Sequence, residues 1–143
     1  MNQEEFNEAA KRHWRWYQAL ADLPVSFRNQ DLSGLDLSGV FLDYAVFANT
    51  NLRGAKIIGA SLNNINFSGA DLSGADLTEA YIASSNLSCA NFNSANLSWA
   101  SLSCSDILMA NFNNACLFEA NLRGIKNYNC ATFTGADLRG IRK

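Results

Sequence analysis

Four cysteines and one histidine are the side chains in this 143-residue sequence best suited to redox chemistry or metal binding. Four thiols could form two disulfide bonds, and cysteines together with histidine could bind zinc. The cysteines are Cys89, Cys104, Cys116 and Cys130, and their spacings match no zinc motif. The chain begins with polar and acidic residues, whereas a secretory signal begins with basic residues followed by an apolar run. We therefore expect a cytoplasmic protein whose thiols stay reduced and fill space or face solvent.

The remaining titratable residues give no catalytic pattern. The acidic residues are separated members of a repeat, and no cysteine has a base beside it within that repeat. The single histidine, His13, falls in a predicted helix. We therefore predict a protein that is not an enzyme and that uses no cofactor and no metal. No stretch contains the run of about 18 apolar residues that a bilayer requires, so no membrane span is predicted.

The net charge of -2 is unevenly distributed along what we expect to be a single structural domain. Residues 30 to 122 carry eight acidic and two basic residues, whereas residues 123 to 143 carry five basic residues and one acidic residue. This asymmetry fits head-to-tail association or different partners at the two ends, and it also fits a drift in the placement of solubilising charges. The basic residues of the tail do not alternate with aromatic residues, which argues against direct nucleic-acid binding.

A five-residue period organises the chain from residue 30 onward. Leu, Ile or Phe recurs at every fifth position from Leu32 to Leu122, and Ala often stands two residues before it. A step of two keeps both side chains on one face of extended backbone, and the following step of three requires a corner. Several of the five-residue units, which we call phrases, place Gly at this corner. A path with regular corners and one inward face forms a solenoid. Stacking of Phe47 on Phe67 and of Phe92 on Phe112 favours a coil of 20 residues, although the glycines fit 15 nearly as well.

Several phrases resemble those of the pentapeptide-repeat family: Ala-Asp-Leu-Ser-Gly at 70 to 74, Ala-Asn-Leu-Arg-Gly at 120 to 124 and Ala-Asp-Leu-Arg-Gly at 136 to 140. The resemblance covers about residues 30 to 140. It implies an all-β solenoid, a right-handed quadrilateral β-helix with four pentapeptides per coil, which we expect to span residues 30–143. After Leu122 the register slips by one residue before Phe133, and we expect Tyr128 to take the inward place there, with a bulge absorbing the extra residue.

Residues 1–29 are predicted to form an N-terminal α-helical cap and its lead-in. Asn2 and Glu5 have the spacing of a capping box, and Pro24 ends the helix. One helical face contains Phe6, Ala10, His13, Tyr17 and Leu20. Since the open end of a solenoid needs a cover, we expect the helix to lie on the first coil through Phe6, Trp14, Tyr17 and Leu20.

Some outward positions of the predicted coils are apolar. These residues form the candidate partner surface: Phe41, Ile58, Tyr81, Trp99, Leu108, Met109 and Phe118. Single exposed apolar residues are ordinary, whereas a joined patch would indicate a protein-binding surface. Our first hypothesis is therefore a non-catalytic scaffold whose rigid walls or ends bind an unidentified protein partner.

Two further hypotheses stay open. The resemblance implies that some family members mimic B-form DNA and act on DNA gyrase, and the predicted acidic wall of Asp36, Asp76, Glu79 and Glu119 supports that reading. The basic tail and the shortness of the rod weaken it. Alternatively, the chain is a structural protein that forms a homo-oligomer through its C-terminal end.

Overall fold

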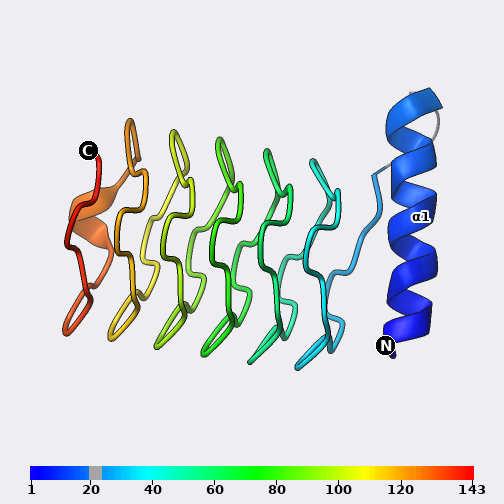
Figure 1. Ribbon diagram of the computed structural model, residues 1–143, viewed down its shortest axis with the longest axis horizontal. Helices are drawn as coiled ribbons and strands as arrows, with labels where there is room; N and C mark the ends of the chain where they lie inside the picture. Colours follow the sequence, from blue (N-terminus) through cyan, green and yellow to red (C-terminus); the bar gives the residue numbers. More distant parts are fainter. Residues whose placement is uncertain (20–23) are drawn as a thin grey trace.

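The computed structural model describes residues 1–19 and 24–143. Helix α1 spans Gln3–Ala19, and a single turn of 3₁₀ helix, η1, spans Tyr128–Cys130. The rest of the described chain winds into stacked coils, and α1 lies across one end of the resulting rod, with the C-terminus at the opposite end (Figure 1). The chain therefore forms a right-handed β-helix with an N-terminal helix, as the five-residue period and the family resemblance predicted.

Main-chain pairing between coils fixes the coil length. Parallel bridges join residues twenty apart, and one column of them passes through Ser26, Val46, Asn66, Asn86, Asp106 and Lys126. Four phrases therefore make one coil, and the alternative of fifteen residues is excluded. Each wall is held by single bridge pairs rather than by long strands. The bridge from Ser26 to Val46 places the first phrase of the β-helix at residues 25 to 29. This is one phrase before the boundary at residue 30 that the repeat of Leu, Ile and Phe indicated.

The large residue and the small residue of each phrase fill the interior. Two stacks of phenylalanines run along the axis because inward positions lie above one another every twenty residues. Ring centroids are 4.7 Å apart for Phe27 and Phe47 and 5.3 Å apart for Phe47 and Phe67, and a second stack joins Phe92 and Phe112 at 4.8 Å. The predicted superposition of these phenylalanines is confirmed.

Each corner of the coil places one residue in the left-handed region. Glycines hold this position in several phrases, as expected, but bulky residues hold it elsewhere: φ is 68° at Tyr44, 59° at Trp99 and 57° at Met109. Main-chain hydrogen bonds impose this conformation, since Trp99 N donates to Phe118 O at 2.9 Å and Ala100 N donates to Leu97 O at 3.1 Å. The corner therefore depends on backbone pairing more than on the residue type.

The register slip lies between Lys126 and Thr132. Bridges after this point join residues 21 apart, beginning with Asn111 and Thr132. The extra residue is accommodated by η1, which follows the left-handed residue Asn127 at φ 59°, and not by the simple β-bulge that we expected. Tyr128 is half-buried, packs on the core and stacks on Phe133 with ring centroids 4.8 Å apart.

Helix α1 begins with the predicted capping box. Asn2 N donates to the Glu5 carboxylate at 2.9 Å, and Glu5 N donates to Asn2 Oδ1 at 2.8 Å. Phe6 is fully buried, with its ring centroid 5.3 Å from that of Phe27. Trp14 and Tyr17 lie farther out and contact Phe41, at 5.1 and 4.6 Å between ring centroids. Leu20, the remaining residue of the predicted cap, lies outside the described residues.

Helix α1 also provides partners for main-chain groups at the edge of the first coil. The side chain of Gln3 accepts from Asp36 N and donates to Asp36 O, both at 2.8 Å. His13 Nε2 donates to Asp43 O at 2.7 Å, and the N-terminal amine donates to Asp31 O at 3.1 Å. In later coils the equivalent groups bond to the preceding coil, so these side chains substitute for a coil that is not there.

The contacts of His13 make this cap sensitive to pH. The side chain is buried, and its Nδ1 accepts from Val25 N at 3.2 Å, which requires the neutral ring with its proton on Nε2. Burial lowers the pKa of His13 in the folded protein below its ordinary value of 6.5. The unfolded chain therefore binds a proton that the folded chain does not, as pH falls below about 6.5.

We predict that the melting temperature falls between pH 7.0 and pH 5.5 in the natural protein and falls less in a His13→Gln variant. A glutamine amide can donate to Asp43 O without titrating in this interval. The comparison isolates the titration of this imidazole because His13 is the only histidine in the chain. Thermal unfolding followed by circular dichroism tests it, and equal pH dependence in the two proteins would contradict it.

We also predict that Gly74→Ala lowers the free energy of unfolding by about 1 kcal/mol, because an alanine resists the left-handed conformation. Gly74 has φ 66°, and an added Cβ meets no atom within 4 Å, so only the backbone conformation is tested. Gly74→Asn is the matched control. It should lower the free energy of unfolding by less than Gly74→Ala does, since Asn114 adopts this conformation two coils later. Denaturant unfolding measures both; an equal cost for the two variants would contradict the explanation.

Candidate partner-binding surface

The seven residues of the candidate surface do not form one patch. Positions twenty apart share a corner or a wall, and successive phrases occupy successive sides of the coil. Ile58, Trp99 and Phe118 belong to one corner, which we call the Trp99 corner. Leu108 and Met109 belong to the diagonally opposite corner, two phrases away, which we call the Met109 corner.

The Trp99 corner carries a stack across three successive coils. The side chain of Trp99 is 54% exposed, and its ring meets Phe118 edge-on with centroids 5.5 Å apart. The Arg139 guanidinium lies 5.6 Å from the centroid of the Phe118 ring. Arg139 also donates to both carboxylate oxygens of Asp137, at 2.9 and 2.7 Å, and these bonds lower the pKa of Asp137 to about 2. One side of Phe118 is thus covered and Trp99 remains available.

Tyr81 lies near this corner, on the wall that follows it. It bridges to Ser101, two residues beyond Trp99, and it is 56% exposed. Ile58 belongs to the same corner as Trp99 but is separated from Phe118 by Thr78 and Ser98 in the intervening coils. The structure therefore brings Trp99, Phe118 and Tyr81 to one region and leaves Ile58 apart from them.

Phe41 shares a column with Tyr81, two coils away, through the bridges of both residues to Ser61. Its ring is covered by Trp14 and Tyr17 of α1. Phe41 therefore contributes to holding the helix and does not join the exposed residues of the Trp99 corner. At the Met109 corner, Leu108 and Met109 are 39% and 67% exposed.

The four acids of the predicted acidic wall lie along one side of the rod, but they do not form a continuous row. Lys56 separates Asp36 from Asp76 in their shared column. Glu79 and Glu119 belong to the Trp99 corner, one coil to either side of Trp99. The coils that follow Asp76 in the column place the neutral residues Asn96 and Cys116 there. The negative charge is therefore interrupted along the rod, and two of the four acids, Glu79 and Glu119, flank Trp99.

The cysteines are separate from one another. All four are free thiols; Cys116 is half-buried with its sulfur 3.1 Å from Ser98 Oγ, and the other three are exposed. Within residues 1–19 and 24–143, no group of three or more His, Cys, Asp or Glu residues could hold a metal ion. In the same part of the chain, no helix combines the length and apolar character that crossing a membrane requires.

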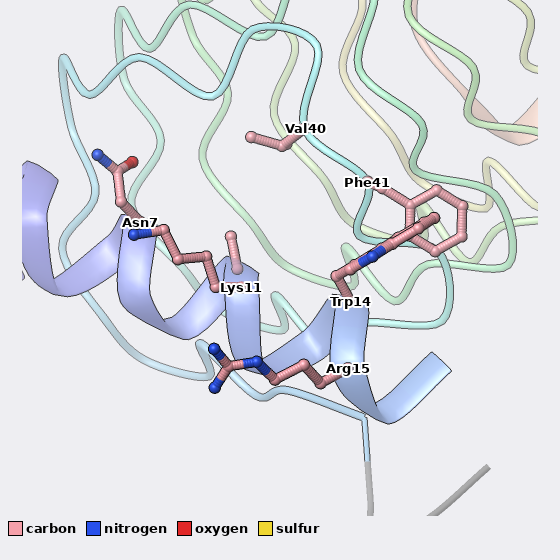
Figure 2. Close-up of a pocket in the computed structure, with 7 residues that line it drawn as sticks. Asn7, Lys11, Trp14, Arg15, Val40 and Phe41 are labelled. Atoms are coloured by element: carbon pink, nitrogen blue, oxygen red, sulfur yellow. The ribbon is translucent and has the colours of Figure 1, made fainter. Parts of the chain in front are cut away.

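Sequence reasoning missed two features. The first is the left-handed conformation of Trp99 and Met109. Neither residue type favours this conformation, and only the position of each residue at the end of its phrase indicates it. A groove between α1 and the first coil was also not anticipated; it is lined by Asn7, Ala10, Lys11, Trp14, Arg15, Val40 and Phe41 (Figure 2). The exposed aromatic residue Trp14 beside the buried face of α1 was the available signal.

Among solved structures, the chain is similar to HetL, a pentapeptide repeat protein involved in heterocyst differentiation regulation from the cyanobacterium Nostoc sp. strain PCC 7120. The identity is 26%, with 84% of this chain and 66% of that chain covered and a TM-score of 0.47. A pentapeptide repeat protein from the Arabidopsis thaliana thylakoid lumen shows 32% identity, coverage of 80% and 65%, and a TM-score of 0.48. The chain thus spans just under two thirds of the length of each of these proteins.

QnrB1, a plasmid-mediated fluoroquinolone resistance protein, shows 23% identity, with 82% of this chain and 76% of that chain covered and a TM-score of 0.36. A search of curated proteins gave no match. The profile of the pentapeptide repeats family matches eight copies within residues 31–69, 65–103 and 85–124. These matches cover more than half of the sequence and agree with the twenty-residue coils, so the chain belongs to the pentapeptide-repeat family.

Proposed function

We propose that this protein is a non-catalytic scaffold that binds another protein through the Trp99 corner. The observation that supports this proposal is the conformation and exposure of Trp99. A tryptophan stands at a left-handed corner, with φ 59°, and keeps more than half of its side chain in solvent. Other corners share this conformation, so the feature that distinguishes the Trp99 corner is an exposed tryptophan.

Other residue types would favour folding more at this position. A residue with a Cβ in the left-handed region costs roughly 1–2 kcal/mol, whereas glycine avoids that cost and asparagine reduces it. Tryptophan is also enriched among the residues that dominate binding energy in protein interfaces. Partner binding accounts for a large exposed aromatic residue at this corner.

The surroundings of Trp99 indicate the chemistry of the partner. Glu79 and Glu119 occupy the same corner in the coils before and after it, and aromatic faces attract cations. Phe118 supports the indole from the side. A partner that presents an arginine or lysine side chain next to an apolar residue would match both the charge and the aromatic surface.

DNA mimicry is a second candidate, favoured by Asp36, Asp76, Glu79 and Glu119 along one side of the rod. We rank it lower because duplex DNA carries one negative charge per about 1.7 Å, whereas Lys56 and neutral residues interrupt the acids here. A gyrase supercoiling assay tests this candidate: the absence of both inhibition and drug protection would exclude it. Self-association through residues 125 to 143 remains a prediction.

We predict that Trp99→Asn weakens partner binding by about 30-fold or more, the effect of losing an interface residue worth roughly 2 kcal/mol. The melting temperature should stay the same or rise slightly, because asparagine holds this corner conformation at Asn49, Asn64 and Asn114. The partner is identified by affinity capture from the native host followed by mass spectrometry, and its affinity is then measured with purified proteins.

Met109→Asn is the matched control, since it also replaces a large exposed residue by asparagine, in the same backbone conformation at the opposite corner. It should leave partner affinity unchanged. If the Trp99 variant binds the partner as tightly as the natural protein does, or if both variants lose binding equally, the Trp99 corner is not the binding surface.

A further inference from the structure

A groove that the Trp99 corner does not use lies where α1 meets the first coil (Figure 2). Its volume of about 590 Å³ is within the range of roughly 300–1,000 Å³ that is typical of small-molecule sites. One side is formed by α1 and the other by Val40 and Phe41 of the first coil. A molecule in the groove would therefore touch both the helix and the rod.

The floor of this groove is apolar. Trp14 meets Phe41 nearly perpendicularly, with an angle of 85° between the rings, and Val40 and Ala10 extend the apolar surface. Trp14 remains 47% exposed, so the helix and the coil do not bury it completely. A compact apolar group placed against Trp14 and Phe41 would complete its burial.

The rim of the groove is cationic. The acidic residues of α1 stand in its first half, at Glu4, Glu5 and Glu8, and the basic residues follow at Lys11, Arg12 and Arg15. Lys11 Nζ pairs with Glu8 at 2.6 Å. Arg15 makes no hydrogen bond or ion pair with any residue that the structure describes. The groove thus combines an aromatic floor with a guanidinium that makes no ion pair and interacts with Glu8 only at longer range.

We propose that this groove binds a small amphipathic anion, a molecule with one carboxylate head group and a compact apolar body. The body lies against Trp14 and Phe41, and the carboxylate pairs with Arg15, whose planar fork of N–H donors matches two carboxylate oxygens. Lys11, whose charge is paired with Glu8, and Asn7 complete the polar rim. A cation is repelled by the same rim, and a neutral molecule of the same shape loses the charged contacts.

The proposed ligand would also strengthen the attachment of α1 to the rod. A ligand that binds only the docked arrangement stabilises it by RT ln(1 + L/Kd), where L is the free ligand concentration, and this term keeps rising with the logarithm of ligand concentration after the site is full. The consequence is measurable as a rise in melting temperature with ligand concentration. This behaviour does not depend on the Trp99 corner, so the two proposals can fail separately.

The test compares 4-phenylbutyrate with its neutral counterpart 4-phenyl-1-butanol on the full-length protein. Binding is followed by calorimetry and by the indole N–H signal of Trp14 in ¹H–¹⁵N NMR spectra. We expect the carboxylate to bind about tenfold or more tightly than the alcohol, as one charge-assisted contact provides. Arg15→Gln should abolish this preference while alcohol binding persists, which also shows that the variant is folded.

Arg12→Gln is the charge-matched control, because Arg12 lies on α1 but does not line the groove, and it should retain the preference. Trp99→Asn should also retain it. Equal affinities for the two compounds, an Arg15→Gln variant that keeps the preference, or signal changes confined to residues outside the groove would overturn the proposal. Binding of a phenylalanine-glutamate peptide without binding of 4-phenylbutyrate would also overturn it and assign the groove to a protein segment.

Discussion

Parallel hydrogen bonding between residues twenty apart is the constraint on which the rest of this structure depends. Each coil after the first forms main-chain hydrogen bonds with the preceding coil, so equivalent positions superpose along the axis. Side chains twenty residues apart then lie next to one another in adjacent coils. Asn91 Nδ2 donates to Asp71 Oδ1 at 3.0 Å and Asn111 Nδ2 donates to Asn91 Oδ1 at 3.1 Å on the outside, while phenylalanines stack on the inside.

The same constraint makes the first coil unusual, because its edge has no preceding coil. Burying apolar residues alone would leave main-chain donors and acceptors without partners, at a cost comparable to a lost hydrogen bond for each group. Gln3 resolves part of this problem because its amide offers one donor and one acceptor, as a peptide group does. His13 contributes a ring donor, and with it the pH dependence of a single buried histidine. The helix is thus a hydrogen-bonding cap as well as an apolar one.

Functional distinction in such a molecule depends on departures from the repeating rule. Most outward positions carry small polar residues that hydrogen-bond along the walls and make one coil resemble the next. Trp99 and Met109 depart from the rule at corners, and Trp14 and Arg15 depart from it on the cap. These residues are large or charged where folding requires neither property, and they lie at three separate places on the rod. We propose binding surfaces at two of these places, the Trp99 corner and the groove beside α1.

The sequence alone determined which residues face inward, where the helix begins and where the register slips, because these features are local. The five-residue ladder, the capping box at Asn2 and Glu5 and the shift before Phe133 can each be read within a few residues. Only the tertiary structure decided which outward residues are neighbours. Phe41 is covered by α1, Trp99 contacts Phe118, and Met109 lies at the opposite corner. These arrangements follow from the number of phrases in each coil, which decides which residues are neighbours across coils. That number is set by hydrogen bonds between residues twenty apart. A five-residue pattern alone fits a coil of fifteen residues as well as a coil of twenty.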